Sequence, residues 1–421
     1  MISLQPVRGT QDLLPETMRR HRHITETARR LAALYGFCEI ATPVFEFTEV
    51  FARPIGEHTD IVSKEMYTFL DRGGEEITLR PEATAGIVRA VLSNGLTQSA
   101  PLKFFYTGPM FRYERPQKGR FRQFHQIDVE ILGVPQPQAD IELIALGWRV
   151  LNRLGIGQQV VVELNTLGDR ESRSAYRDAL VSYLSARQAH LSEESRGRLA
   201  RNPLRILDSK DEGDRRIVAE APEFSAFLNP ASSAFFARVQ AGLDQLGIAY
   251  RLNPRLVRGL DYYSHTVFEF VTTALGAQGT VLAGGRYDGL VELMGGPRMA
   301  GVGWAAGVER LAMLIGDPPT EPRPFVVIPI GEEAEAMALT IAETLRSDDY
   351  RVELSYSGNL SRRLRYANRI AARGALLIGE DERARNVVKV RDLDSGEECE
   401  VLLDPLLSNL RERLKALSEA G

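Results

Sequence analysis

Residues 102–133 read LKFFYTGPMFRYERPQKGRFRQFHQIDVEILG and predict two strands joined by a basic loop. In the second half of this stretch, five residues recur with a period of two, which places them on one face of a strand. They are Arg122, Phe124, Gln126, Asp128 and Glu130. A guanidinium, an aromatic ring, an amide and two carboxylates on one face are typical of a ligand site and unusual on a solvated surface.

The loop between the two predicted strands, residues 113–121, is strongly basic. With its flanks it contains one acid, Glu114, and five basic residues: Arg112, Arg115, Lys118, Arg120 and Arg122. Two interpretations remain open on composition alone. The loop is either a solvated turn that protects a strand edge, or a hairpin whose arginines hold a polyphosphate and whose tip meets a nucleic acid.

The segment FRYERPQKGRFRQFHQ resembles motif 2 of the class II aminoacyl-tRNA synthetases, and most closely that of the histidyl-tRNA synthetases. Further upstream, residues 15–35 predict a helix with apolar residues at Ile24, Ala28, Leu31 and Leu34, and residues 36–51 predict a strand interrupted by Pro43. This pair resembles motif 1, which implies a homodimer interface. An ordinary edge strand is the alternative.

Residues 66–70 and 76–80 predict a hairpin, and RPEATAG, residues 80–86, opens a helix after it. Locally, Glu82 and Thr84 would serve the free amides of the first helical turn. The resemblance implies instead that both hold the α-amino group of histidine together with Gln126. Ala83 stands where the family often has glycine.

The segment VRGLDYY, residues 257–263, follows a strand-like stretch over 250–257 and precedes a predicted strand, 266–272. Two adjacent tyrosines are explained locally by core packing. The resemblance to histidyl-tRNA synthetases is specific here and implies that Arg258 stabilises the transition state. It also implies that Glu130 and Tyr263 hydrogen-bond the two imidazole nitrogens, with Tyr262 in the pocket wall.

The segment GVGWAAGVER, residues 301–310, has the glycine spacing of a dinucleotide fingerprint, but no buried strand precedes it. We interpret it as a strand of small residues that leads into a helix carrying Glu309 and Arg310. It resembles class II motif 3, which implies that Arg310 lies against the ATP phosphates. A surface arginine is the local alternative. With motif 2, the resemblance also implies that Arg112 is a fixed cation and that Phe124 stacks on adenine.

The chain length of 421 residues predicts more than one domain. We expect a catalytic domain over 1–319 with a helical insertion at about 169–246, which in the family reaches toward the tRNA acceptor stem. A proline-rich linker precedes an α/β domain over 324–421 that resembles the anticodon-binding domain. Its residues 360–373 contain five arginines and no acidic residue. This composition indicates either a solvated helix face or a surface that binds RNA. The predicted tRNA contacts are Arg115, Lys118, Arg120, Arg362, Arg365 and Arg369.

The bulk composition is that of an ordinary globular protein with a net charge of −4, so RNA binding requires local basic patches. No apolar run predicts a membrane span, and the start of the chain is not a signal peptide, which favours a cytoplasmic protein. The two cysteines have no partner motif. The six histidines are scattered, so the sequence does not predict a histidine metal site.

Together these features predict an α/β protein whose α+β catalytic core has a mixed, mainly antiparallel sheet flanked by helices. The implied reaction joins histidine to ATP and then to tRNA(His), with magnesium accompanying ATP on unknown ligands. A synthetase paralogue that regulates ATP phosphoribosyltransferase is the alternative function, and a non-specific RNA-binding protein is a third. The full arginine set and the C-terminal domain argue against the paralogue, and RGLDYY argues against the third.

Overall fold

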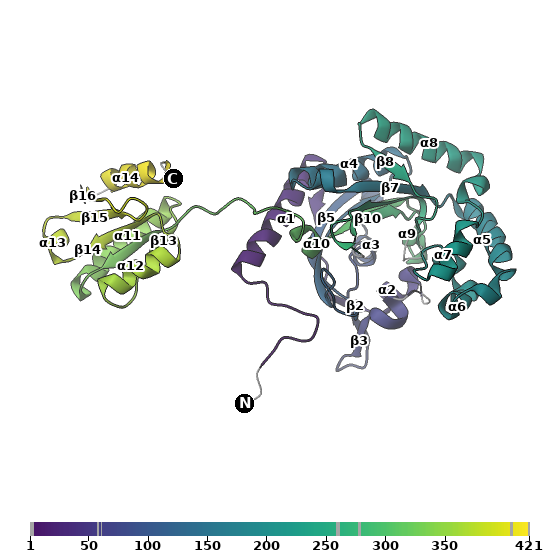
Figure 1. Ribbon diagram of the computed structural model, residues 1–421, viewed down its shortest axis with the longest axis horizontal. Coiled ribbons are helices and arrows are strands. Elements are labelled where there is room, and N and C mark those ends of the chain that lie inside the picture. The colour runs from purple at the N-terminus through teal and green to yellow at the C-terminus, as the bar shows by residue number, and fades with distance from the viewer. Residues whose placement is uncertain are drawn as a thin grey trace. The chain divides into compact units, whose positions relative to one another are not determined.

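The computed structural model describes residues 4–56, 59, 61–257, 262–276, 279–404 and 407–419. The predicted cation Arg258 lies outside the described residues. The chain divides into two compact units, Met1–Pro318 and Pro319–Gly421, whose elements are labelled in Figure 1.

The first unit is built on an eight-stranded sheet. Its strands are β1 (Cys38–Glu39), β5 (Leu102–Phe111), β6 (Gln123–Leu132), β7 (Val161–Thr166), β8 (Tyr250–Leu252), β9 (Ser264–Val271), β10 (Thr280–Arg286) and β11 (Gly301–Gly307). They lie in the order β1-β5-β6-β11-β10-β9-β7-β8. Only the outer pairs β1–β5 and β7–β8 are parallel, which confirms the predicted mixed and mainly antiparallel sheet.

Four helices cover one face of this sheet: α1 (Pro15–Leu34), α4 (Gln138–Arg153), α8 (Pro230–Gln245) and α10 (Val308–Ala312). Ile127, Val129 and Ile131 of β6 point into the core beneath them. Because side chains alternate along a strand, the even-numbered residues of β6 point to the opposite face. The expectation that Leu34 belongs to the buried stripe of α1 was wrong, since it is 75% exposed. At about 100° per residue, Leu34 lies well away from the direction of Ile24.

The opposite face carries α3 (Thr84–Ser93) and a three-stranded sheet of β2 (Phe45–Phe47), β4 (Glu76–Leu79) and β3 (Tyr67–Leu70). Two short helices, α2 (Glu49–Ile55) and α9 (Leu290–Leu293), lie beside them. The single interrupted strand predicted for 36–51 was wrong: β1 joins the large sheet and β2 joins the small one. Pro43 stands between the two strands, where a residue without a backbone N–H costs no ladder hydrogen bond.

Between β7 and β8 the chain forms a helical insertion, drawn in teal in Figure 1. It contains α5 (Arg170–Ser185), α6 (Glu193–Arg201) and α7 (Glu212–Ala219), and it is followed by α8. The side chains of Asp169, Ser192 and Asp211 each accept a hydrogen bond from the first turn of the helix that follows. After the insertion, the strand-like stretch predicted for 250–257 is a strand only as far as Leu252, because Asn253 begins a turn by accepting from the Arg255 amide.

The second unit has a five-stranded sheet in the order β13-β12-β14-β15-β16. Its strands are β12 (Phe325–Pro329), β13 (Val352–Leu354), β14 (Gly374–Ile378), β15 (Val387–Asp392) and β16 (Glu398–Leu402). Its helices are α11 (Glu335–Ser347), α12 (Leu360–Arg369), α13 (Glu380–Ala384) and α14 (Ser408–Glu419). The parallel pairs β12–β13 and β12–β14 and the β15–β16 hairpin agree with the predicted βαβ units and terminal hairpin.

Candidate active site

A pocket of about 280 Å³ lies on the face of the large sheet that the even-numbered residues of β6 share. Nine of the predicted site residues line it: Glu82, Thr84, Arg112, Arg120, Phe124, Gln126, Tyr262, Tyr263 and Arg310. Arg122, expected on the same face, lies elsewhere, because β6 begins one residue later and its guanidinium stacks 3.8 Å from the ring centre of Tyr113. The pocket therefore joins segments from four distant parts of the chain.

Glu130 lies behind the pocket wall and is 2% exposed. Thr84 Oγ1 donates to its Oε1 at 2.5 Å, and the Tyr287 hydroxyl donates to its Oε2. Burial raises the pKa of Glu130 to about 8, although both hydroxyl hydrogen bonds act in the opposite direction. A Cβ atom on Gly303 would lie 1.6 Å from Glu130 Oε2, so only glycine at that position leaves room for the carboxyl group.

Glu82 serves the first turn of α3 and also lines the pocket. Its Oε2 accepts from the Thr84 amide at 3.0 Å and its Oε1 from the Ala85 amide at 2.8 Å, which satisfies the first turn of α3. The same carboxyl group lines the pocket and lies 3.5 Å from the Tyr262 hydroxyl. Burial raises the pKa of Glu82, and a nearby cation would stabilise its charged form.

Asp128 and Gln126 contribute unsatisfied acceptors to this end of the pocket. Among the described residues, Asp128 Oδ2 and Gln126 Oε1 are buried and have no hydrogen-bond partner. Burial, and then the charges of Glu130 and Glu82, raise the pKa of Asp128 well above its ordinary value. A buried acceptor without a donor is costly in a folded protein, and a ligand donor would relieve that cost. The sequence placed Asp128 on this face but assigned it no role.

Three tyrosines close the same end of the pocket. The ring centres of Tyr262 and Tyr263 lie 4.8 Å apart, and those of Tyr262 and Tyr287 lie 5.7 Å apart. All three are buried. Tyr287 was missed as a site residue. Its link to Glu130 arises from the pairing of β10, β11 and β6 and has no local signature.

Arginines also line the pocket. Arg112 Nε donates to the Pro81 carbonyl at 2.9 Å, and its guanidinium lies 5.3 Å from the ring centre of Phe124. Arg310 Nη1 donates to the Thr280 carbonyl at 2.7 Å. Arg120 pairs with Glu114 at 2.5 Å and faces the pocket, whereas Arg115 and Lys118 are exposed on the loop. The pocket thus has three guanidinium groups in its lining, together with the carboxyl groups of Glu114, Glu269 and Glu309.

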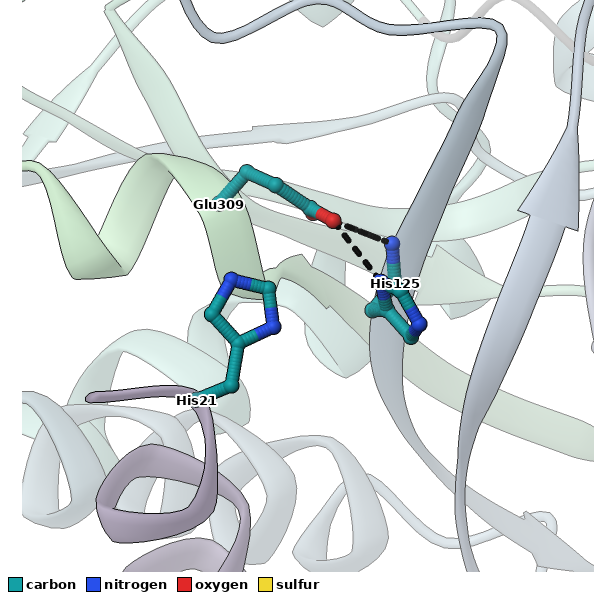
Figure 2. Close-up of side chains that lie close together, drawn as sticks. All are labelled: His21, His125 and Glu309. Carbon is teal, nitrogen blue, oxygen red and sulfur yellow. Dashed lines mark hydrogen bonds and ion pairs between the residues drawn. The ribbon is translucent and has the colours of Figure 1, made fainter. Parts of the chain in front are cut away.

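One cluster of metal-ligating side chains includes Glu309, which lines the pocket. Among the residues that the model describes, His21, His125 and Glu309 are the set of three such side chains whose donor atoms all lie within 4.8 Å of one another (Figure 2). Sequence spacing did not predict it, because the three residues come from α1, β6 and α10.

In the second unit, the five arginines of 360–373 divide into two groups. Arg362, Arg365 and Arg369 are exposed and line a groove of about 560 Å³ with Tyr356 and Tyr366. Arg363 donates to the Gly358 and Pro329 carbonyls, and Arg373 is buried and pairs with Asp392 at 2.6 Å. Arg363 also lines the groove, but its guanidinium is held by these two carbonyls, whereas Tyr356 beside the first three is 83% exposed.

Comparison with known families covers both units. The family model described as histidyl-tRNA synthetase matches residues 9–311, and the anticodon binding domain model matches residues 325–413. No described helix is both long and apolar enough to cross a membrane.

The chain is similar over nearly its whole length to curated histidine–tRNA ligases. It is 60% identical to that of Rhodospirillum rubrum, over 94% of this chain and 96% of the relative. It is 58% identical to that of Gluconacetobacter diazotrophicus, over 97% of this chain and 100% of the relative. Among solved structures, the apo histidyl-tRNA synthetase of S. aureus superposes with a TM-score of 0.81 at 33% identity, covering 96% of this chain and 98% of that one.

Proposed function

The chain belongs to the histidyl-tRNA synthetase family, and on this premise we propose that it acts as a histidine–tRNA ligase through the pocket of the first unit. The reaction joins the carboxylate of histidine to the α-phosphate of ATP and releases pyrophosphate. The histidyl group is then transferred to the 3′ end of tRNA(His). One observation carries the proposal: a single pocket brings buried carboxyl groups and tyrosines together with the guanidinium groups of Arg112, Arg120 and Arg310. This combination fits a ligand with an ammonium group beside a polyphosphate.

The α-ammonium group of histidine is held by Glu82, Thr84 and Gln126. The imidazole lies between Glu130 and Tyr263, with Tyr262 in the wall. A carboxylate facing one ring nitrogen and a phenol facing the other favour a ring with nitrogens on both sides. The raised pKa of Glu130 means that a bound ring N–H restores a charge that burial suppresses.

Arg112 and Arg310 hold phosphate oxygens and Phe124 stacks on the adenine. Arg258, outside the described residues, supplies the cation that meets the charge developing on the α-phosphate. The protein forms no covalent bond with the substrates, so rate enhancement comes from positioning and from these fixed charges. The fold is suited to both, because Phe124 is on β6 and Arg310 is on α10, which directly follows the neighbouring strand β11.

Magnesium would accompany ATP as a hard cation with oxygen ligands and neutralise phosphate charge. Such ions need only one or two protein carboxylates beside phosphate and water oxygens. Glu269 fits this requirement, because it lines the pocket and its charge acts on Arg310. Its Oε2 also accepts from Thr280 Oγ1 at 2.8 Å, which orients the carboxylate.

The tRNA would meet the protein at two places. Arg115, Lys118 and Arg120 lie on the loop beside the pocket, where the acceptor end must arrive. Arg362, Arg365 and Arg369 with the exposed Tyr356 offer cations and a stacking ring to unpaired bases in the second unit. The tRNA substrate makes the cytoplasm the expected compartment.

A homodimer is favoured by the small sheet of the first unit. Phe45 and Phe47 of β2 are 54% and 56% exposed, and Phe69 and Leu70 of β3 are 49% and 69% exposed. Exposed apolar side chains gathered on one element are typical of an interaction surface. Sedimentation of the parent chain and of Phe45→Lys tests this, with dissociation expected in the variant.

Histidine-dependent exchange of labelled pyrophosphate into ATP tests the main proposal. The ligase requires exchange that histidine stimulates and that histidinol, which lacks the carboxylate, does not support. A regulatory paralogue or a non-specific RNA-binding protein predicts no exchange. Curated relatives at 45–60% identity are histidine–tRNA ligases, which favours the ligase.

A further inference from the structure

His21, His125 and Glu309 converge from α1, β6 and α10, and Figure 2 shows the two rings and the carboxylate turned toward one another. The His21 and His125 ring centres lie 5.4 Å apart, edge to face. His125 Nδ1 lies 2.8 Å from Glu309 Oε1. His21 and Glu309 are 4% and 6% exposed, whereas the His125 side chain is 25% exposed and opens a route to solvent.

We propose that these three side chains form a binding site for zinc. Two imidazoles and one carboxylate are a donor set that zinc takes in proteins, with a fourth position left for water. Magnesium and calcium prefer all-oxygen sites and are poor candidates. Ligands of one tetrahedral zinc lie about 3.3 Å apart, given bonds of about 2.0–2.1 Å. His125 and Glu309 therefore separate slightly on binding, and His21 moves toward them.

The position of the cluster gives the zinc a consequence for the reaction. Phe124 precedes His125, and Arg310 follows Glu309; both neighbours line the proposed ATP end of the pocket. Both oxygens of Glu309 accept from the His125 backbone amide at 3.0 Å, which ties α10 to β6. Zinc would draw one Glu309 oxygen away from this amide. The distance between Phe124 and Arg310 would then change. Occupancy should therefore raise the KM for ATP more than the KM for histidine, a consequence that rests on the proposed function.

Cobalt(II) is the probe, because its visible absorption reports nitrogen and oxygen ligands in a tetrahedral site. The parent, His21→Gln and His23→Gln are titrated with cobalt and then with zinc. His23 is a matched control: it lies two residues along the same helix, about 200° around its axis from His21. Melting temperatures without metal show whether each variant is folded.

We expect the parent and His23→Gln to bind one cobalt ion per chain, with zinc displacing it, and His21→Gln to lose this absorption. Zinc should raise the KM for ATP severalfold in the parent and leave it unchanged in His21→Gln. The proposal is overturned if the parent shows no saturable absorption, or if His21→Gln and His23→Gln bind cobalt equally. Loss of ATP–pyrophosphate exchange in the metal-free parent would instead contradict the ligase, leaving the cobalt titration to judge the site.

Discussion

Thr84 Oγ1 donates a hydrogen bond of 2.5 Å to Glu130 Oε1, although the two residues are 46 positions apart. The bond joins the start of α3 to the last part of β6, and the Tyr287 hydroxyl donates to the other oxygen of the same carboxyl group. Glu130 is thus held by two hydroxyl groups in a buried position before any substrate arrives. Such orientation lowers the entropic cost of binding, so the pocket's preference for histidine should depend strongly on this residue.

Glu130→Gln keeps the shape of the side chain and removes the charge that the carboxyl group gains when it accepts the ring N–H of bound histidine. A charge-assisted hydrogen bond contributes about 1.5–3 kcal/mol, so histidine affinity should fall about tenfold or more. The KM for ATP should change much less. Steady-state ATP–pyrophosphate exchange measures both constants. A loss of ATP affinity with unchanged histidine affinity would show that this face of β6 serves the nucleotide.

The same substitution should change how stability depends on pH. Burial raises the pKa of Glu130 from 4.5 to about 8, so the folded chain holds a proton that the unfolded chain has released. The stability associated with that proton is complete below pH 4.5 and is lost as the pH rises to about 8. The parent should therefore lose stability between pH 4.5 and about 8, whereas Glu130→Gln should not. The difference in stability between the two proteins should change across this range in favour of the variant and stay constant above it. Melting temperatures measured at several pH values test this, and parallel curves for the two proteins would contradict it.

Asp128→Asn should weaken the binding of ligands that carry an ammonium group. The substitution replaces the buried, unpaired Oδ2 by an amide and so removes an acceptor for an N–H donor. Histidine and histidinol should both bind several times more weakly, whereas imidazolepropionate, which lacks the ammonium group, should be unaffected. Inhibition constants in the exchange assay measure these affinities.

Asp214→Asn is the control for Asp128→Asn, because Asp214 is a fully buried carboxylate outside the pocket that accepts from three serine side chains. It should alter thermal stability without changing ligand preference. Equal weakening of all three ligands by Asp128→Asn would mean that Asp128 supports the pocket wall and does not contact the ammonium group.

Replacing Arg362, Arg365 and Arg369 together by glutamine should weaken tRNA binding and flatten its salt dependence. Each lost phosphate contact lowers the slope against salt by about 0.9 at most. Adenylate formation should be unchanged. The control replaces Arg351 and Arg385, exposed arginines already paired with Glu321 and Glu400. If tRNA affinity depends on salt equally in the triple variant and the control, α12 is exposed to solvent and does not contact the tRNA phosphates.

Arg258→Lys should slow adenylate formation, because lysine cannot present two parallel donors to a phosphate. Losing one well-placed transition-state donor costs about 2.7–4 kcal/mol, or roughly a hundred- to a thousandfold in rate. Substrate affinities and transfer from preformed histidyl-adenylate should change much less. Rapid-quench measurement of each half-reaction tests this, with Arg251→Lys, an exposed residue paired with Glu163, as the control. A near-parental rate of activation would assign the role to another group.

The local sequence pattern was sufficient to predict a feature wherever that feature depends on a single helix or strand. The period of two in β6 separated Phe124, Gln126 and Asp128 from the core residues Ile127 and Val129, because alternation is a property of any strand. The helices of the insertion and the strand-to-helix turn before Arg310 followed from similar short-range signals. The order of the motifs along the chain indicated the family, and the family models that match both units support it.

Long-range pairing decided the rest. Arg363 and Arg373 are held by the Pro329 carbonyl and the Asp392 carboxylate, partners from other segments that the count of arginines over 360–373 does not show. The partners of Glu130, and the meeting of His21 with His125 and Glu309, depend on the register of several strands and on the seating of α1 and α10. By itself the sequence determined which face of β6 is occupied by Phe124, Gln126 and Asp128. Only the tertiary structure decided which faces meet, because that depends on packing between segments far apart in the chain.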